Sequence, residues 1–274
     1  MNKEETKKIV REGYAKVATQ KSSCCGPVNS CCGTADAAQD ISKKIGYTDE
    51  ELKAVPEGAN LGLGCGNPTA LASLKKGETV LDLGSGPGLD CFLAADKVGK
   101  GGKVIGIDMT PEMLEKARAN AAKGNYSNVE FRLGEIENLP VADNSVDAVI
   151  SNCVINLSPD KESVFKETFR VLKPGGRIMV SDVVLSKDLP DFIKDSVDAY
   201  VGCISGAIPK DKYLKTVADV GFKEVSIVSE TSIPVDEWFN DPIAESVINK
   251  LKVSSEQAKE VLGSVISVKV KGVK

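Results

Sequence analysis

The sequence predicts an α/β fold in which a parallel, doubly wound β-sheet carries helices on both faces. Three observations predict it. Strand-like segments alternate with helix-like segments between residues 79 and 184. The strand-like segments are nearly continuous runs of apolar residues, as strands covered on both faces are. Prolines and glycines lie between the segments, at positions that suit the starts of helices and the ends of strands.

The elements of this core follow one another in a regular order. Five segments are expected to be strands, namely 79–84, 103–108, 128–134, 146–152 and 176–184. A helix is expected over 88–97, and a second begins at Thr110, because Thr can cap a helix and the Pro that follows suits its first turn. A third begins in the same manner at Ser158 and ends near Leu172, before a Lys-Pro-Gly-Gly turn.

The regions on either side of the core are less regular. Before it we expect a short amphipathic helix, a cysteine-rich loop and irregular structure, over 3–18, 19–38 and 41–72. After it we expect helices over 190–201, 210–220 and around 241–262, and strands over 222–230 and 263–273. The last segment alternates like a strand with one exposed face. The chain therefore divides into an N-terminal arm, a core and a C-terminal region, 1–72, 73–190 and 191–274.

Two residue counts narrow the chemistry, because the 274-residue chain has eight cysteines and no histidine. Without histidine there is no Ser-His-Asp or Cys-His pair and no imidazole base. The net charge of −4 indicates no nucleic-acid partner, and no apolar run reaches the roughly 18 residues of a membrane span. Because the N-terminus also lacks the apolar segment of a secretory signal, we expect a cytoplasmic protein with reduced thiols and no membrane partner.

A glycine-rich loop follows the first strand, at the edge where open α/β sheets bind ligands. It reads DLGSGPG from Asp82 to Gly88, and Asp108 ends the next strand at a spacing that suits an acid bound to a ribose diol. A pyrophosphate is bound by bare amides, so an acid at Asp82 does not suit it. The sulfonium and the amino group of S-adenosylmethionine are cationic and would suit a carboxylate at Asp82. The alternatives are a turn-capping role for Asp82 and a helix-capping role for Asp108.

Four motifs between roughly residues 73 and 185 resemble class I S-adenosylmethionine-dependent methyltransferases, in the order VLDLGSGPG, VIGID, GEIENLP and VLKPGG. The resemblance implies a Rossmann-like, mostly parallel sheet of seven strands with the last antiparallel. It also implies S-adenosylmethionine as cofactor, with no metal required, and an acid at Glu135 that takes the adenine amine. The expected cofactor-binding residues are Asp82, Gly84, Ser85, Gly86, Gly88, Asp108, Met109, Gly134, Glu135, Ile136 and Asn152.

Three cysteines lie where a substrate is expected. Cys153 follows the fourth strand, and glycines near Cys65 and Cys203 keep the backbone around each sulfur small. Each could instead be a small buried residue. Cys91, which has apolar neighbours, is expected in the core.

Two pairs of adjacent cysteines lie in the N-terminal arm, Cys24-Cys25 and Cys31-Cys32. Four cysteines can bind zinc, but this spacing is unusual for such a site. An arm that captures a soft ion fits better.

The chain from Tyr47 to Phe222 closely resembles the arsenite S-adenosylmethionine methyltransferases, through YTDEELKAVPEGANLGLGCGNP, DLGSGPGLDC, GIDMTPEML, SNCVINLSPDK and GCISGA. The resemblance implies that Cys65, Cys153 and Cys203 hold trivalent arsenic in a catalytic role. It implies a fourth cysteine from the N-terminal arm, for which Cys32 is preferred and then Cys25. It further implies thiol-bound As(III) as substrate, arsenic detoxification, a thioredoxin- or glutathione-type reductant and a C-terminal region on the substrate side.

This chemistry agrees with the residue counts. Thiolates bind trivalent arsenic, and its lone pair can attack the methyl group without losing a proton, so no general base is needed. Two alternatives stay open. A carbon methyltransferase of a quinone- or sterol-like molecule would give the cysteines no role. A metalloid- or zinc-binding protein with a vestigial core would leave the acids Asp82, Asp108 and Glu135 without a purpose.

Overall fold

A seven-stranded sheet in the order β3-β2-β1-β4-β5-β7-β6 organises the chain. Its first five strands pair in parallel, and β7 is antiparallel to both of its neighbours. The strands are β1 Thr79–Leu83, β2 Lys103–Asp108, β3 Val129–Leu133, β4 Val146–Asn152, β5 Leu172–Leu185, β6 Lys223–Ser232 and β7 Val265–Val273. The predicted seven-stranded, mostly parallel sheet is confirmed.

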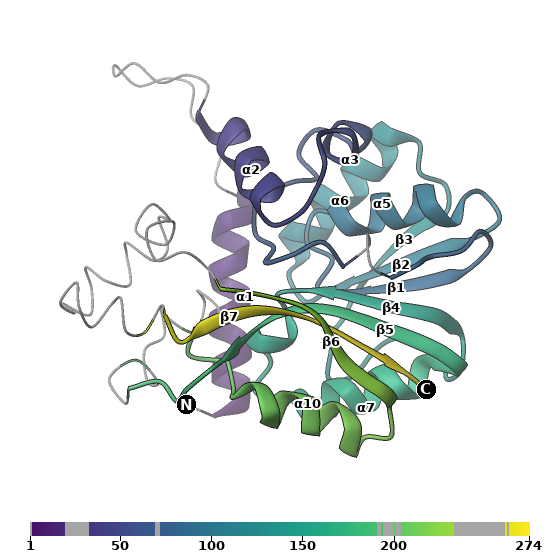
Figure 1. The fold of residues 1–274 in the computed structure, drawn as a ribbon. Helices are drawn as coiled ribbons and strands as arrows, with labels where there is room; N and C mark the ends of the chain where they lie inside the picture. Colours follow the sequence, from purple (N-terminus) through teal and green to yellow (C-terminus); the bar gives the residue numbers. More distant parts are fainter. Residues whose placement is uncertain are drawn as a thin grey trace, which may run out of the picture.

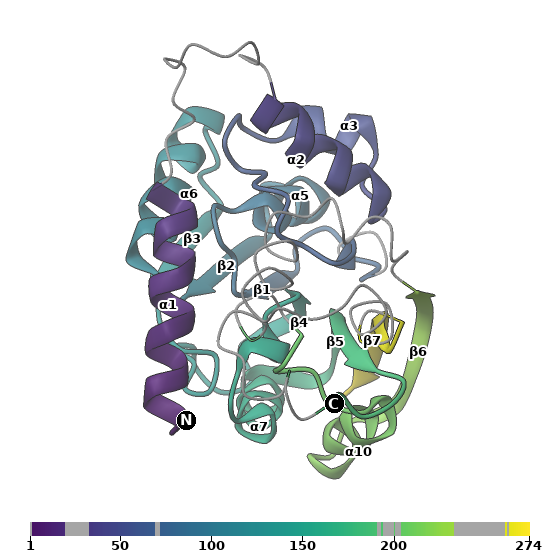
Figure 2. The same ribbon diagram turned by 90° about the vertical axis from the view of Figure 1, so that its left-hand side faces the viewer.

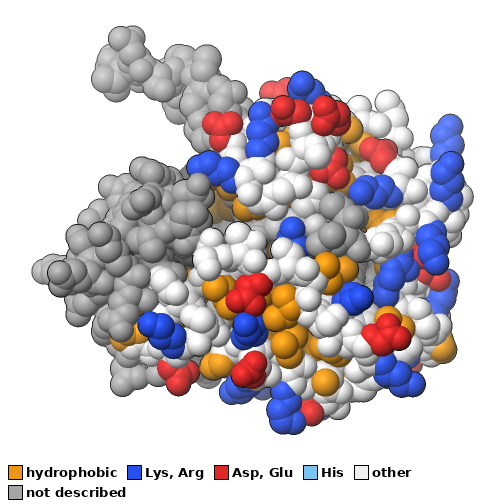
Figure 3. All heavy atoms as spheres, in the orientation of Figure 1, with side chains coloured by type: hydrophobic (Ala, Val, Ile, Leu, Met, Phe, Trp, Pro, Cys, Tyr) orange, Lys and Arg blue, Asp and Glu red, His pale blue; other side chains and the backbone are white. Residues whose placement is uncertain are grey.

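This computed structural model describes residues 2–19, 33–68, 72–190, 204–232 and 263–274, together with Ile193, Tyr200 and Val261. The helices predicted over 190–201 and 241–262 therefore lie almost entirely outside the described residues. Within the described ranges, no helix has both the length and the apolar character to cross a bilayer. Acidic and basic side chains are mixed over the face shown in Figure 3, with no broad area of one sign.

Helices cover both faces of the sheet, as Figure 1 shows, because its strands are apolar on both sides. Leu81 and Leu83 of β1 pack on one face with Tyr213, whereas Val80 packs on the other with Phe92. On one side lie α3 Asp49–Ala54, α5 Leu89–Val98 and α6 Pro111–Gly124, and on the other lie α7 Lys161–Val171 and α10 Lys210–Asp219. A short 3-10 helix, η1 Ile155–Leu157, follows β4.

The N-terminal region is more helical than expected. The predicted first helix is confirmed as α1 Lys3–Thr19, which packs against α6 across one end of the sheet (Figure 2). Two further helices, α2 Gly33–Lys44 and α3, occupy part of the segments predicted as loop and irregular structure, so those predictions are wrong there. Helix α3 forms because a capping box stabilises its first turn, in which the side chains of Thr48 and Glu51 each accept a hydrogen bond from the backbone N–H of the other.

Two predictions about the second half of the sheet are also corrected. The Lys-Pro-Gly-Gly segment is a bulge inside β5 instead of a turn before it, because Leu172 pairs with Val146 and Arg177 with Ala148. The exposed face expected for β7 is largely absent, since this strand lies between β5 and β6 and buries Ile266, Val268 and most of its other apolar side chains.

Candidate functional site

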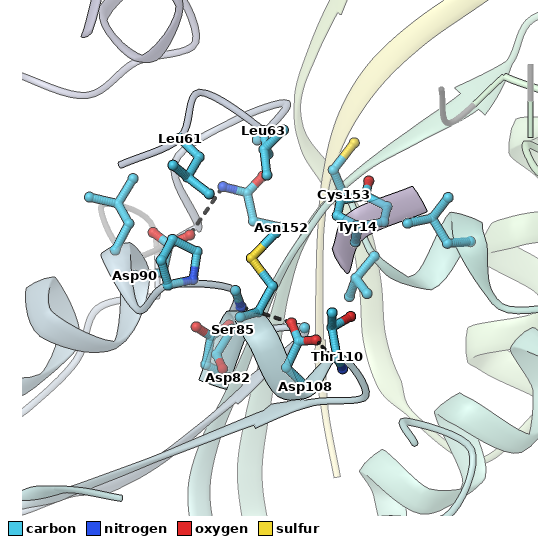
Figure 4. A pocket seen from close by; sticks show the side chains of 18 of the residues that line it. Tyr14, Leu61, Leu63, Asp82, Ser85, Asp90, Asp108, Thr110, Asn152 and Cys153 are labelled. Carbon is cyan, nitrogen blue, oxygen red and sulfur yellow. Dashed lines mark hydrogen bonds between the residues drawn. The ribbon is translucent and has the colours of Figure 1, made fainter. Parts of the chain in front are cut away.

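A cavity of about 130 Å³ opens at the carboxyl ends of the parallel strands (Figure 4). Its walls come from the glycine-rich loop after β1, the ends of β2 and β4, the segment after β3, and α1. Nine of the eleven predicted cofactor-binding residues line it, and Gly88 and Glu135 do not.

Asp108 holds the glycine-rich loop in place. Its Oδ2 accepts a hydrogen bond from the Gly86 N–H at 2.9 Å, and its Oδ1 accepts one from the Thr110 N–H at 2.8 Å. The Thr110 side chain makes no capping bond to α6, although the sequence predicted one. The loop keeps the Ser85 hydroxyl buried with no hydrogen-bond partner among the described residues. A ligand with polar groups would satisfy this hydroxyl.

Three aspartates, Asp82, Asp90 and Asp108, line the cavity, and none forms an ion pair with a described lysine or arginine. Burial raises the pKa of Asp82 well above its usual value, and the nearby Asp90 raises it further. Burial also raises the pKa of Asp90 to about 6, against hydrogen bonds from Tyr47 and Asn152 that lower it. Buried carboxylates that have no lysine or arginine partner favour a cationic ligand.

Helix α1 forms a wall of the cavity, whereas the N-terminal helix and arm were expected to contribute to the arsenic site. Lys7 of this helix pairs with Glu135 at 2.6 Å and lies 4.0 Å from Glu137. Glu137 lines the cavity beside Gly134 and Ile136, whereas Glu135 points to Lys7 from outside the cavity lining. The predicted bond between Glu135 and an adenine amine therefore stays a prediction, and Glu137 is a second acid near the same place.

Two of the three predicted arsenic ligands lie together beside the cavity. Cys153 is 7% exposed, lines the cavity and has a left-handed backbone with φ of +59°. Cys153 belongs to an apolar cluster that includes Val183 and Leu185, and Cys65 packs against this cluster. Neither thiol is in a disulfide. The third, Cys203, lies outside the described residues, as do all four arm cysteines, including Cys32.

Cys91 is fully buried, which confirms its prediction as a core residue. Its thiol also donates a hydrogen bond to Asp82 Oδ2 at 3.2 Å. Burial raises the pKa of Cys91 well above its usual value, so the thiol keeps its proton and remains a donor. Within the described ranges, no group of three Cys, Asp or Glu residues is placed to hold a metal ion.

Comparisons with known proteins agree with this geometry. A family model described as a methyltransferase domain matches residues 74–221. A solved arsenic(III) S-adenosylmethionine methyltransferase from Chlamydomonas reinhardtii is 31% identical, with a TM-score of 0.64, and the match covers 88% of this chain and 73% of that one. The chain belongs to the arsenite methyltransferase family. An arsenite methyltransferase from Halobacterium salinarum is 50% identical over 247 residues, which is 87% of this chain and 63% of the relative.

The chain thus spans less than two thirds of the length of this curated arsenite methyltransferase. A more distant match is a demethylmenaquinone methyltransferase from Lactococcus lactis, which is 42% identical over 103 residues, or 38% of this chain and 41% of that protein.

Two residues of this arsenite methyltransferase family member were missed by the sequence reasoning although they line the cavity, Tyr47 and Asp90. Tyr47 is buried at 3% exposure and donates a hydrogen bond to Asp90 Oδ1 at 2.7 Å. A signal for Asp90 was present, because it lies two residues after Gly88 of the loop and has no lysine or arginine nearby in the sequence to pair with. No local pattern marks Tyr47, whose partner lies 43 residues away.

The raised pKa of Asp90 predicts pH-dependent binding of S-adenosylmethionine. A cationic ligand favours the ionised carboxylate, so binding releases a proton and weakens as Asp90 is protonated below its pKa of about 6. Asp82 and Asp108 face the same cavity, and burial raises their pKa values as well, so their protonation weakens binding in the same direction. The charge of Glu51 raises the pKa of Asp90 further. We expect the affinity to fall roughly fourfold or more between pH 7.5 and 5.5.

Isothermal titration calorimetry in two buffers of different ionisation enthalpy measures both the affinity and the proton release. S-Adenosylhomocysteine, which lacks the sulfonium charge, is the matched control and should show a smaller change. Equal affinity for S-adenosylmethionine at both pH values would mean that these carboxylates do not face its positive charge.

Proposed function

We propose that this chain transfers the methyl group of S-adenosylmethionine to trivalent arsenic held by cysteine thiolates. The observation that carries the proposal is that Cys153 lines the same cavity as Asp82 and Asp108. A soft, thiophilic site therefore adjoins an acidic one. The arsenic methyltransferase activity for which the relatives from Halobacterium salinarum and Chlamydomonas reinhardtii are named supports the same conclusion.

The cavity fits the methyl donor in three respects. The carboxylates of Asp82 and Asp90 suit its cationic end, and Asp108 suits a ribose diol. The buried Ser85 hydroxyl, which has no hydrogen-bond partner among the described residues, is available to bond a polar group of the ligand. When bound there, S-adenosylmethionine supplies an electrophilic methyl group. Apolar side chains, including Leu61 and Leu63, line the same space and exclude water from it.

The protein's part in the transfer is to bind and orient the reactants. The thiolates of Cys65 and Cys153 bind arsenic and leave its lone pair available. The As–C bond forms as the S–C bond of the donor breaks, and arsenic formally passes from the trivalent to the pentavalent state. Because no proton leaves the nucleophile, a chain without histidine can perform this step. Alignment of the reactants can supply about 7–11 kcal/mol of the barrier.

Several finer features belong to the same proposal. Arsenic enters as a thiol conjugate, Cys203 completes its three thiolate ligands, and one arm cysteine, Cys32 before Cys25, joins the site. A thioredoxin- or glutathione-type thiol restores cysteines that are oxidised when arsenic is reduced again. The protein acts in arsenic detoxification without a resident metal, and its need for reduced thiols suits a cytoplasmic location. Methylation of a quinone-like carbon is less well supported, because it gives Cys65 and Cys153 no role.

The test is a direct assay of the purified chain. It is incubated with arsenite, reduced glutathione and methyl-labelled S-adenosylmethionine, and the arsenic species are separated by chromatography. We expect labelled methylarsenic that depends on arsenite and on protein. If the chain binds S-adenosylmethionine but forms no methylated arsenic, the proposal is wrong. A demethylmenaquinone analogue in place of arsenite tests the carbon methyltransferase.

A further inference from the structure

The side-chain amide of Asn152 joins the cavity to the segment that carries Cys65. Asn152 lines the cavity at the end of β4, and its Oδ1 accepts a hydrogen bond from the Cys65 N–H at 3.0 Å. The Cys65 Sγ lies 3.9 Å from the same oxygen. Cys65 itself is not part of the cavity lining. The amide is therefore a physical connection between two places that the proposed reaction must align.

The other end of this amide faces three acceptors. Asn152 Nδ2 lies 2.7 Å from the Gly66 carbonyl, 2.9 Å from the Tyr47 hydroxyl and 3.1 Å from Asp90 Oδ2. An amide has two N–H groups, so two of the three contacts are filled at one time. Figure 4 shows Asn152 extended toward Asp90, with Cys153 beside it. Tyr47 completes the network by donating to the other oxygen of Asp90 at 2.7 Å.

The backbone around Cys65 is packed closely against this amide and the sheet. A Cβ added at Gly64 would lie 2.6 Å from Asn152 Nδ2, and one added at Gly66 would overlap the Ser181 hydroxyl. Ser267 of β7 donates a hydrogen bond to the Cys65 carbonyl at 2.8 Å. The segment can therefore follow a small shift of Asn152 but has no room to move independently of it.

We propose that Tyr47 is a positioning residue, which holds Asp90 and Asn152 so that the state of the cofactor cavity sets the place of the Cys65 thiol. Asp90 receives hydrogen bonds from Tyr47 and Asn152 and also lines the cavity. A cation that binds beside Asp90 therefore changes the same hydrogen bonds that orient the Asn152 amide. The role in catalysis rests on the proposed function, whereas the coupling itself does not.

The substitution Tyr47→Phe removes the hydroxyl and keeps the ring. Tyr126→Phe is a matched control, because the Tyr126 hydroxyl also donates to an aspartate, Asp96 Oδ2 at 3.2 Å, and does not line the cavity. We expect Tyr47→Phe to lower kcat for arsenic methylation by about 10- to 100-fold, as loss of an orienting partner does. The Kd for S-adenosylmethionine should stay within about threefold of wild type, and Tyr126→Phe should match wild type in both.

A second measurement needs no arsenic. The rate at which iodoacetamide alkylates Cys65 is followed by mass spectrometry of its peptide, with and without saturating S-adenosylhomocysteine. Cys65 does not line the cavity but Gly64 before it does, so the Tyr47→Phe variant separates an effect through the network from a direct contact with this segment. We expect the ligand to change this rate by about threefold or more in wild type and in Tyr126→Phe, and not in Tyr47→Phe.

The outcomes separate the coupling from the proposed function. If S-adenosylhomocysteine leaves the wild-type alkylation rate unchanged, or changes it equally in Tyr47→Phe, the coupling is overturned. If the ligand changes the alkylation rate as expected but neither the wild-type protein nor any variant methylates arsenic, the proposed function fails and the coupling stands. Should Tyr47→Phe melt well below wild type, Asp90→Asn repeats the alkylation measurement alone, at saturating S-adenosylhomocysteine, because its amide cannot accept at both positions.

Discussion

Replacement of Cys153 by serine is expected to lower arsenic methylation by at least about 100-fold while the Kd for S-adenosylmethionine stays within about threefold of wild type. The reason is chemical hardness, because a hydroxyl is a poor ligand for soft trivalent arsenic and stays protonated at neutral pH. The fold should tolerate the change, since serine is slightly smaller than cysteine at a position that is 7% exposed. Cys65→Ser should behave in the same way.

The ligand set is measured directly by X-ray absorption of the arsenite complex. We expect three As–S bonds in the wild-type protein and one fewer in each variant. Calorimetry with S-adenosylmethionine is the control for folding and for the cofactor cavity. Full turnover in Cys153→Ser would show that this thiol is not an arsenic ligand, and a loss of cofactor binding equal to the loss of turnover would mean that its role is to bind the cofactor instead.

The sequence predicts the sheet well because the signals are local. Continuous apolar segments mark the strands, and the acid Asp108 is recognisable from its place at a strand end. The start of helix α3 is also predictable from the sequence, because Thr48 and Glu51 have the spacing of a capping box. The pairing order could not be predicted in this way, since the position of β7 between two strands depends on contacts far apart in sequence.

The candidate site divides in the same way. Its glycines and acids lie in short motifs, whereas the Asn152 network joins residues that are widely separated in sequence. Cys65 and Asn152 are 87 residues apart, and Asn152 and Tyr47 are 105 apart. The amphipathic pattern of α1 predicts a helix but not what it covers, so the contribution of Lys7 to the cavity wall needed the structure.

Two alanine substitutions in the glycine-rich loop should have different effects. Gly84 and Gly86 both have left-handed backbones, with φ of +67° and +51°. A Cβ at Gly84 would overlap the side chain of Val154 and lie 2.7 Å from its Cβ, whereas one at Gly86 meets nothing within 4 Å. We expect Gly84→Ala to lower the free energy of unfolding by about 3 kcal/mol or more, and Gly86→Ala by only about 1–2 kcal/mol.

Gly86→Ala is the more informative variant for function, because Gly86 lines the cavity and its N–H is held by Asp108. A methyl group added where a ligand approaches the backbone costs about 1–3 kcal/mol of binding, so the affinity for S-adenosylmethionine should fall about tenfold or more in a protein that remains folded. Urea unfolding gives the stability, and calorimetry gives the affinity. Wild-type affinity in Gly86→Ala would mean that the cofactor does not approach this backbone. Equal stability of the two variants would mean that Val154 moves aside and that the close packing at Gly84 is not what requires glycine there.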